Sequence, residues 1–179
     1  MLVAMKLSTP PACSPGVRNL LAEARQSAPG LRQMLAEEPD RWGPVFKDVI
    51  VETRAGANLA LAEVKALPSS EQALETTLTF LEGGLVTGVF EALASHALRS
   101  VEDLNPPTDA VLREAEQIAS SQGKTGLDGY VQAHRDNLDG TCQKLAEVDS
   151  VEEFRSLLTE VYLEGIAVGA GEGLLATIS

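Results

Sequence analysis

Residues 71–94 read EQALETTLTFLEGGLVTGVFEALA, and residues 153–176 read EFRSLLTEVYLEGIAVGAGEGLLA. The two stretches match at an offset of 82 residues, which pairs Glu82 with Glu164. Each stretch is long, mostly apolar and poor in charge, as helices at the centre of a core are. The repetition therefore predicts two equivalent central helices in an internal duplication.

Two shorter segments earlier in the chain repeat in the same order. Residues 21–28 resemble residues 112–119, and the string LAEV occurs at residues 61–64 and again at 145–148. The offset changes only between segments, where Pro, Gly and Ser collect, and insertions confined to loops produce this pattern. Each copy therefore holds three matched segments.

We predict an all-α fold of six main helices, arranged as two tandem three-helix units related by a pseudo-twofold axis. The units span about residues 15–100 and 108–179, inside a single helical domain at residues 14–179. A flexible leader is expected at residues 1–13. No alternation of apolar and polar residues is long enough to predict a strand.

Helix caps and breakers divide the chain further. Pro29 with Gly30 and, later, Pro39 are expected to interrupt helices. Ser69 or Ser70 is expected to cap the helix after Pro68, and Ser150 with Glu153 forms a capping box. The linker between the two units is expected at residues 105–107. The expected helices cover about residues 14–28, 31–38, 44–67, 69–99, 109–122, 127–148 and the chain from residue 150 onward.

The chain is acidic, with a formal net charge of −12, and its 14 Lys and Arg residues are scattered singly. Binding of nucleic acid through its phosphates depends on clustered basic residues, so no nucleic-acid partner is expected. The same charge disfavours anionic membranes. It is compatible with a cytoplasmic protein, or with a basic protein partner that docks by complementary charge.

No segment reads as a signal for export or for a membrane. The residues before Pro10 are too few for a signal-peptide core. Glutamates interrupt the apolar stretches at residues 78–98 and 161–178, so we expect core helices there rather than membrane spans. Cys13 and Cys142 show no CxxC spacing and make no disulfide framework, which favours a reducing, cytoplasmic compartment.

Glycines recur in both predicted central helices, although each glycine inside a helix costs about 0.5–1 kcal/mol relative to alanine. One interpretation is a close crossing that brings two helix backbones into contact. The other is a cavity beside the two glutamates that precede glycine, Glu82 and Glu164. The glycines lie four residues apart in two stripes, Gly84 and Gly88 in one and Gly165, Gly169 and Gly173 in the other.

Glu82 and Glu164 are the candidate catalytic residues. If both approach the pseudo-twofold axis, repulsion and burial would raise the pKa of at least one carboxyl group. One could then act as a general acid while the other acts as a base. Five further residues are candidates for binding a ligand beside them: Thr87, Glu91, His96, Tyr162 and Glu172.

No metal or cofactor is predicted. Di-iron bundles need a glutamate three residues before a histidine, and neither His96 nor His134 has one. Two histidines make no zinc signature, and phosphate loops, GxGxxG and hydrolase elbows are absent from the sequence. The polar cluster at residues 134–139 is expected to be a solvated helix face.

Two functional hypotheses follow. The first is a protein that binds a small polar or cationic molecule between its central helices, as an enzyme or as one subunit of a hetero-oligomeric enzyme. The second is a non-catalytic acidic interaction module, such as an adaptor, an antitoxin-like or an immunity-type protein, that engages a basic partner or forms an oligomer. A pocket above about 300 Å³ at the central helices favours the first. A filled core with one acidic face favours the second.

Overall fold

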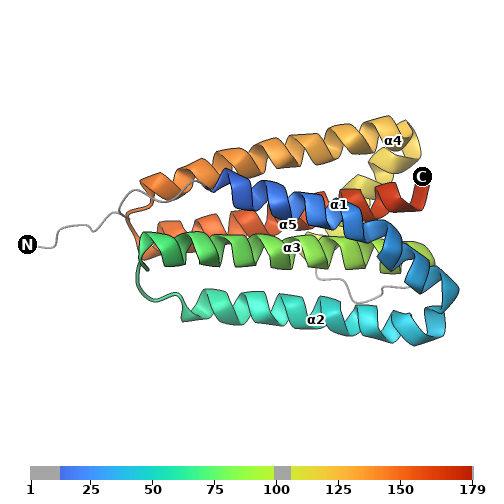
Figure 1. The fold of residues 1–179 in the computed structure, drawn as a ribbon, viewed down its shortest axis with the longest axis horizontal. Coiled ribbons are helices and arrows are strands. Elements are labelled where there is room, and N and C mark those ends of the chain that lie inside the picture. Colours follow the sequence, from blue (N-terminus) through green and yellow to red (C-terminus); the bar gives the residue numbers. More distant parts are fainter. Residues whose placement is uncertain (1–12, 99–105, 179) are drawn as a thin grey trace, which may run out of the picture.

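The computed structural model describes residues 13–98 and 106–178, and in these residues the chain forms helices and no strand (Figure 1). The predicted all-α class is confirmed. The expected leader lies outside the described residues apart from Cys13. The helices are α1 (Ser14–Glu37), α2 (Pro39–Glu63), α3 (Ser70–Leu98), α4 (Pro106–Gln143), the short 3₁₀ helix η1 (Lys144–Glu147) and α5 (Val151–Ile178).

Helices α3 and α5 form the centre of the bundle and make its most extensive contact. They run side by side in the same direction, with α1 and α4 packed on them and α2 on the far side of α3 (Figure 1). By length and composition both could cross a membrane, which is weak evidence because buried core helices pass the same test. In α3 and α5, 67% and 72% of the most apolar window is buried inside the bundle.

Glycines let the backbones of α3 and α5 touch. A Cβ added to Gly88 would lie 2.7 Å from the backbone nitrogen of Ala170, and one added to Gly169 would lie 2.9 Å from that of Val89. Real Cβ atoms essentially never come so close, so a side chain at either position would push the helices apart. The close-crossing interpretation is confirmed for these glycines, and the opposing backbone occupies the space beside them.

The contacts between the two central helices are reciprocal. Gly88 of α3 lies against Ala170 of α5, and Gly169 of α5 lies against Val89 of α3. Adding 81 to the residue numbers of α3 gives the residues of α5 that make the matching contact. The sequence comparison predicted an offset of 82 between the two helices.

At an offset of 81, residues 84–93 (GLVTGVFEAL) align with residues 165–174 (GIAVGAGEGL). This alignment places Glu91 opposite Glu172 as equivalent residues, whereas Glu82 becomes equivalent to an exposed leucine, Leu163.

The expected break at Pro29 is wrong, because α1 continues through it to Glu37. Pro29 lies on the exposed face of the helix, so the carbonyl group that loses its intrahelical hydrogen bond can be hydrated instead. Ala28 and Leu35 are buried on the opposite face, and this packing holds the helix together across the proline. The break at Pro39 is confirmed. The expected helix start at about residue 44 is wrong, because α2 begins at Pro39 and continues through Pro44.

Gly123 interrupts α4. Its φ of 64° and ψ of −152° lie in a region of backbone conformation that is essentially open to glycine alone, and two helical segments meet across this kink. The predicted helix end near residue 122 is therefore confirmed. The expected linker at residues 105–107 is corrected in its last two positions, because α4 already begins at Pro106.

Two predicted helix caps are present. Ser69 Oγ accepts a hydrogen bond of 3.3 Å from the backbone N–H of Gln72, and Ser150 Oγ accepts one of 3.1 Å from that of Glu153. The Glu153 carboxylate in turn accepts a bond of 3.2 Å from the backbone N–H of Asp149. These bonds satisfy amide groups that a helix start leaves without a partner.

Cys13 and Cys142 form a disulfide bond that joins the start of α1 to the end of α4. Their Cα atoms are 6.0 Å apart, within the usual range for such a bond. The expectation that the two cysteines make no disulfide is therefore wrong. The pairing has no local signature because the two residues are 129 positions apart in the sequence.

Candidate functional site

The two candidate catalytic residues lie against different outer helices. Glu82 is exposed on α3 and lines a small cavity of about 110 Å³ between α3 and α1, together with Glu23. Glu164 of α5 is half-buried and contacts α4, where its carboxylate pairs with His134 Nδ1 and lies 3.4 Å from Asn137 Nδ2. No interaction between the two glutamates is present among the described residues.

His134 is half-buried and paired with Glu164, so the expectation of a purely solvated face at residues 134–139 is wrong at this position. The ring of Tyr130 packs edge-on against His134, with 4.5 Å between the ring centroids. Burial, followed by the charges of Glu114 and Glu164, raises the pKa of Tyr130. Within the described residues, its buried hydroxyl has no hydrogen-bond partner.

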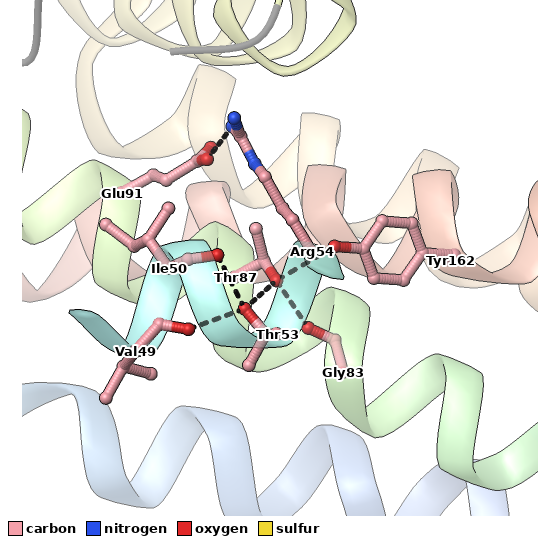
Figure 2. Close-up of polar contacts among 8 residues, drawn as sticks. All are labelled: Val49, Ile50, Thr53, Arg54, Gly83, Thr87, Glu91 and Tyr162. Atoms are coloured by element: carbon pink, nitrogen blue, oxygen red, sulfur yellow. Dashed lines mark hydrogen bonds and ion pairs between the residues drawn. The ribbon is translucent and has the colours of Figure 1, made fainter. Parts of the chain in front are cut away.

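Three of the candidate ligand-binding residues lie together in a buried polar cluster between α2, α3 and α5 (Figure 2). Thr87 Oγ1 lies 2.7 Å from the carbonyl oxygen of Gly83, 2.9 Å from Thr53 Oγ1 and 3.2 Å from the hydroxyl of Tyr162. Thr53 donates to the carbonyl of Val49 at 2.8 Å. The hydroxyl groups thus link one side chain from each of three helices.

Glu91, the third candidate in this cluster, forms an ion pair with Arg54 of α2 (Figure 2). The Glu91 side chain is 1% exposed and that of Arg54 is 15% exposed, so the pair is closed off from solvent. Burial raises the pKa of Tyr162, and the negative charge of Glu91 acts in the same direction. The hydrogen bond with Thr87 and the charge of Arg54 partly oppose this rise.

Glu172 lies in a second Glu–Arg pair that is open to solvent. Arg25 of α1 donates from Nε to both carboxylate oxygens, at 3.1 and 3.2 Å, and from Nη2 to one of them at 2.9 Å. The Glu172 side chain is 4% exposed, but that of Arg25 is 53% exposed. This hydrogen bonding, followed by the charge of Glu172 and then that of Asp128, raises the pKa of Arg25.

A pocket of about 390 Å³ opens beside this second pair, between α1, α4 and α5. Lys124 and Asp128 of α4 contribute a second pair of opposite charges to its wall. They lie one helical turn apart, directly after the kink at Gly123, so the kink sets the direction of the segment that carries both. The apolar part of the wall comes from Pro29, Leu175 and Ala176.

Glu91 and Glu172 occupy equivalent positions in the reciprocal contact of the central helices. Each is buried, and each pairs with an arginine from an outer helix, Arg54 or Arg25. The first pair is closed, whereas the second forms part of a pocket wall. The two glutamate–arginine pairs therefore differ in their access to solvent.

The remaining candidate, His96, is exposed near the end of α3 and takes no part in either glutamate pair. An open groove of about 580 Å³ lies where η1 and α5 meet. Its wall is strongly acidic, with Glu147, Glu152, Glu153 and Glu160 beside a single Lys144. Across residues 13–98 and 106–178, no group of three or more His, Cys, Asp or Glu side chains could hold a metal ion.

The sequence-based candidates omitted the partner of every buried glutamate. Arg54 follows Phe46 and Ile50 by eight and four residues, so it lies on the buried face of α2, where a charge needs a counter-ion. Arg25 stands in the same relation to Val17 and Leu21 on α1. Lys124 and Asp128 could not be identified in this way, because both are exposed and neither follows a buried residue pattern that requires a counter-ion.

Comparison of the chain with known protein families, with curated proteins and with solved structures finds no match.

Proposed function

We propose that this protein binds a small charged molecule in the pocket formed by Arg25, Lys124, Asp128 and Glu172. The observation that carries the proposal is the pocket itself, whose volume of about 390 Å³ lies within the usual range for small-molecule sites. Its wall combines an apolar patch with four convergent charged groups, and such groups fix a ligand's orientation.

The contrast with the sealed Glu91 pair supports this proposal. A buried ion pair contributes little net stability, because the desolvation of the two charges offsets their attraction. The exposed guanidinium of Arg25 makes the second pair accessible to a ligand, which the Arg54 pair is not. Recognition of a ligand would explain why the charges of Arg25 and Glu172 are present at this accessible position.

We also propose that the chain consists of two related three-helix units, α1 to α3 and α4 to α5, with α4 counted as two segments on either side of Gly123. The reciprocal glycine contacts and the matching pair Glu91 and Glu172 support this arrangement. Superposition of residues 17–98 on residues 109–178 tests it. A rotation far from 180°, or halves that do not superpose, would contradict it.

Calorimetry against a panel of polar metabolites tests the binding proposal. The double variant Lys124→Gln/Asp128→Asn removes two exposed pocket charges without changing the net charge, and we expect binding to weaken at least tenfold. The matched control is Lys47→Gln/Asp48→Asn, which makes the same exchange at exposed positions of α2. Equal binding by the native protein and the pocket variant would overturn the proposal.

A catalytic role of Glu82 and Glu164 is a separate proposal. Each would act alone, since the two carboxylates contact different helices. Glu82→Gln and Glu164→Gln keep the shape of the side chain and remove its charge, so loss of turnover without loss of folding would support the role. Unchanged turnover would assign both residues to the structure.

The acidic groove at η1 and α5 favours a second candidate function, an interaction module for a basic protein segment. Association through these charges would weaken steeply as salt is added. Replacing Glu152 and Glu153 by Gln should abolish such binding and leave binding of a small molecule in the Glu172 pocket unchanged.

A further inference from the structure

We propose that the ligand of the Glu172 pocket is a zwitterion, with an ammonium and a carboxylate group a few bonds apart on a small aliphatic skeleton, as in an α-amino acid. This inference rests on the proposed function, because it names the chemical class of the molecule bound there.

The balance of charge in the pocket wall carries the inference. Two positive groups, Arg25 and Lys124, face the same space as two negative groups, Asp128 and Glu172. A simple anion would be attracted by Arg25 and Lys124 and repelled by Asp128 and Glu172. A simple cation would be attracted by the two negative groups and repelled by the two positive ones. Only a ligand that carries both charges complements the whole wall.

The hydrogen bonds of Arg25 leave part of its guanidinium for a ligand. Glu172 accepts from Nε and Nη2, and no described residue accepts from Nη1, which can therefore donate to a ligand carboxylate. The Lys124 ammonium would be the second positive group. Arginine suits this role because its planar fork can bind two carboxylates at once.

The two acidic residues of the pocket wall, Glu172 and Asp128, have different roles. Glu172 is buried and held by Arg25, whereas Asp128 is exposed and lies near enough to Arg25 for its charge to raise the pKa of that group. Asp128 is therefore the group free to take a ligand ammonium at the rim. The apolar residues Pro29, Leu175 and Ala176 would contact the aliphatic part of the ligand.

Three compounds of matched skeleton provide the test: L-leucine, isocaproate, which lacks the amino group, and isoamylamine, which lacks the carboxylate. Titration of the full chain, followed by calorimetry and by amide chemical shifts, should give a dissociation constant for leucine at least tenfold lower than for either other compound. Shifts should concentrate on the amide groups of residues in the pocket wall, such as Lys124 and Glu172.

Single charge variants separate recognition from a general effect on structure. Asp128→Asn should weaken the binding of leucine but not of isocaproate, and Lys124→Gln should weaken leucine but not isoamylamine. The controls Asp48→Asn and Lys47→Gln should leave all three affinities unchanged. Arg25→Gln alone would leave the buried Glu172 carboxylate without its arginine. Arg25 is therefore tested in the double variant Arg25→Gln/Glu172→Gln, which should lose leucine binding and remain folded.

Two negative results are distinguishable. If isocaproate or isoamylamine binds as tightly as leucine through Lys124 or Asp128, the zwitterion inference is overturned and the binding of a charged molecule stands. If none of the three compounds and no member of the wider metabolite panel binds, both proposals fail.

Discussion

Gly84 and Gly165 meet with no side chain between them: a Cβ on Gly84 would lie 3.1 Å from the Cα of Gly165, and one on Gly165 would lie 3.2 Å from the Cα of Gly84. The contact is the same seen from either helix. It places the backbones of α3 and α5 against each other along one face, so the packing of these two helices depends on the absence of side chains there.

Alanine at these glycines should destabilise the protein. Gly88→Ala or Gly169→Ala introduces a methyl group against opposing backbone, which cannot move aside as a side chain can, and overpacking of this kind costs roughly 1–3 kcal/mol. Chemical denaturation measures the change in the free energy of unfolding. Gly165→Leu should cost more than Gly165→Ala.

Matched glycine controls lie on the outer helices. Nothing lies within 4 Å of a Cβ added to Gly56 or Gly129, so alanine there should stabilise the protein by about 0.5–1 kcal/mol through helix propensity alone. Equal effects at Gly56 and Gly88 would contradict the close crossing.

The Arg54 and Glu91 pair should be costly to break on one side. Arg54→Leu leaves a carboxylate that is 1% exposed without its arginine, and such changes cost roughly 3–5 kcal/mol. The double variant Arg54→Leu/Glu91→Leu should recover much of this loss, because it removes both buried charges. A double-mutant cycle in denaturant measures the coupling, and a coupling near zero would show that the pair is incidental.

Alkaline pH should weaken the fold through Tyr130 and Tyr162. Burial raises the pKa of both above the ordinary tyrosine value of 10.0, so the folded state keeps protons that the unfolded state loses. Stability contributed by each phenol is therefore fully present below pH 10 and is lost as the pH rises from there through the raised pKa of the folded state.

Tyr130→Phe separates the two effects of that residue. It removes a buried hydroxyl that has no hydrogen-bond partner within the described chain, so stability at neutral pH should stay equal or rise by about 1 kcal/mol. The decline above pH 10 should become shallower. A variant as sensitive to alkali as the native protein would show that Tyr130 titrates in an ordinary way.

Reduction of the disulfide between Cys13 and Cys142 should lower the melting temperature. The bond closes a long loop, and the loss of such a cross-link costs roughly 2–5 kcal/mol by its effect on the unfolded chain. Cys13→Ser should melt at the temperature of the reduced native protein and should not respond to reductant. A native protein whose melting is insensitive to reductant would contradict a stabilising role.

The helical class and most helix starts could be read from the sequence because local signals determine them. Ser69 and Ser150 cap helices, and Pro39 and Gly123 each end one, all through interactions within a few residues. Pro29 misled the prediction because its effect depends on which face of the helix it occupies. That face is known only once the packing of α1 is known.

Less of the candidate site could be predicted from the sequence. Thr87, Glu91 and Tyr162 were expected beside Glu82 and Glu164, and the structure instead places these three residues together in a separate polar cluster. Their partners Thr53 and Arg54 come from α2, and no local pattern links the helices. The glycine contacts between α3 and α5 follow an offset of 81 residues, one fewer than the offset that matches Glu82 with Glu164.

The parallel course of α3 and α5 also affects the order in which the chain can fold. Helix α5 is synthesised after all four helices that it contacts, and its most extensive contact is with a helix about 80 residues earlier. Until α5 emerges from the ribosome, the glycine face of α3 has no backbone to pack against. Contacts so distant in sequence slow folding, so the first three helices should remain incompletely packed during synthesis and complete their core only when α5 arrives.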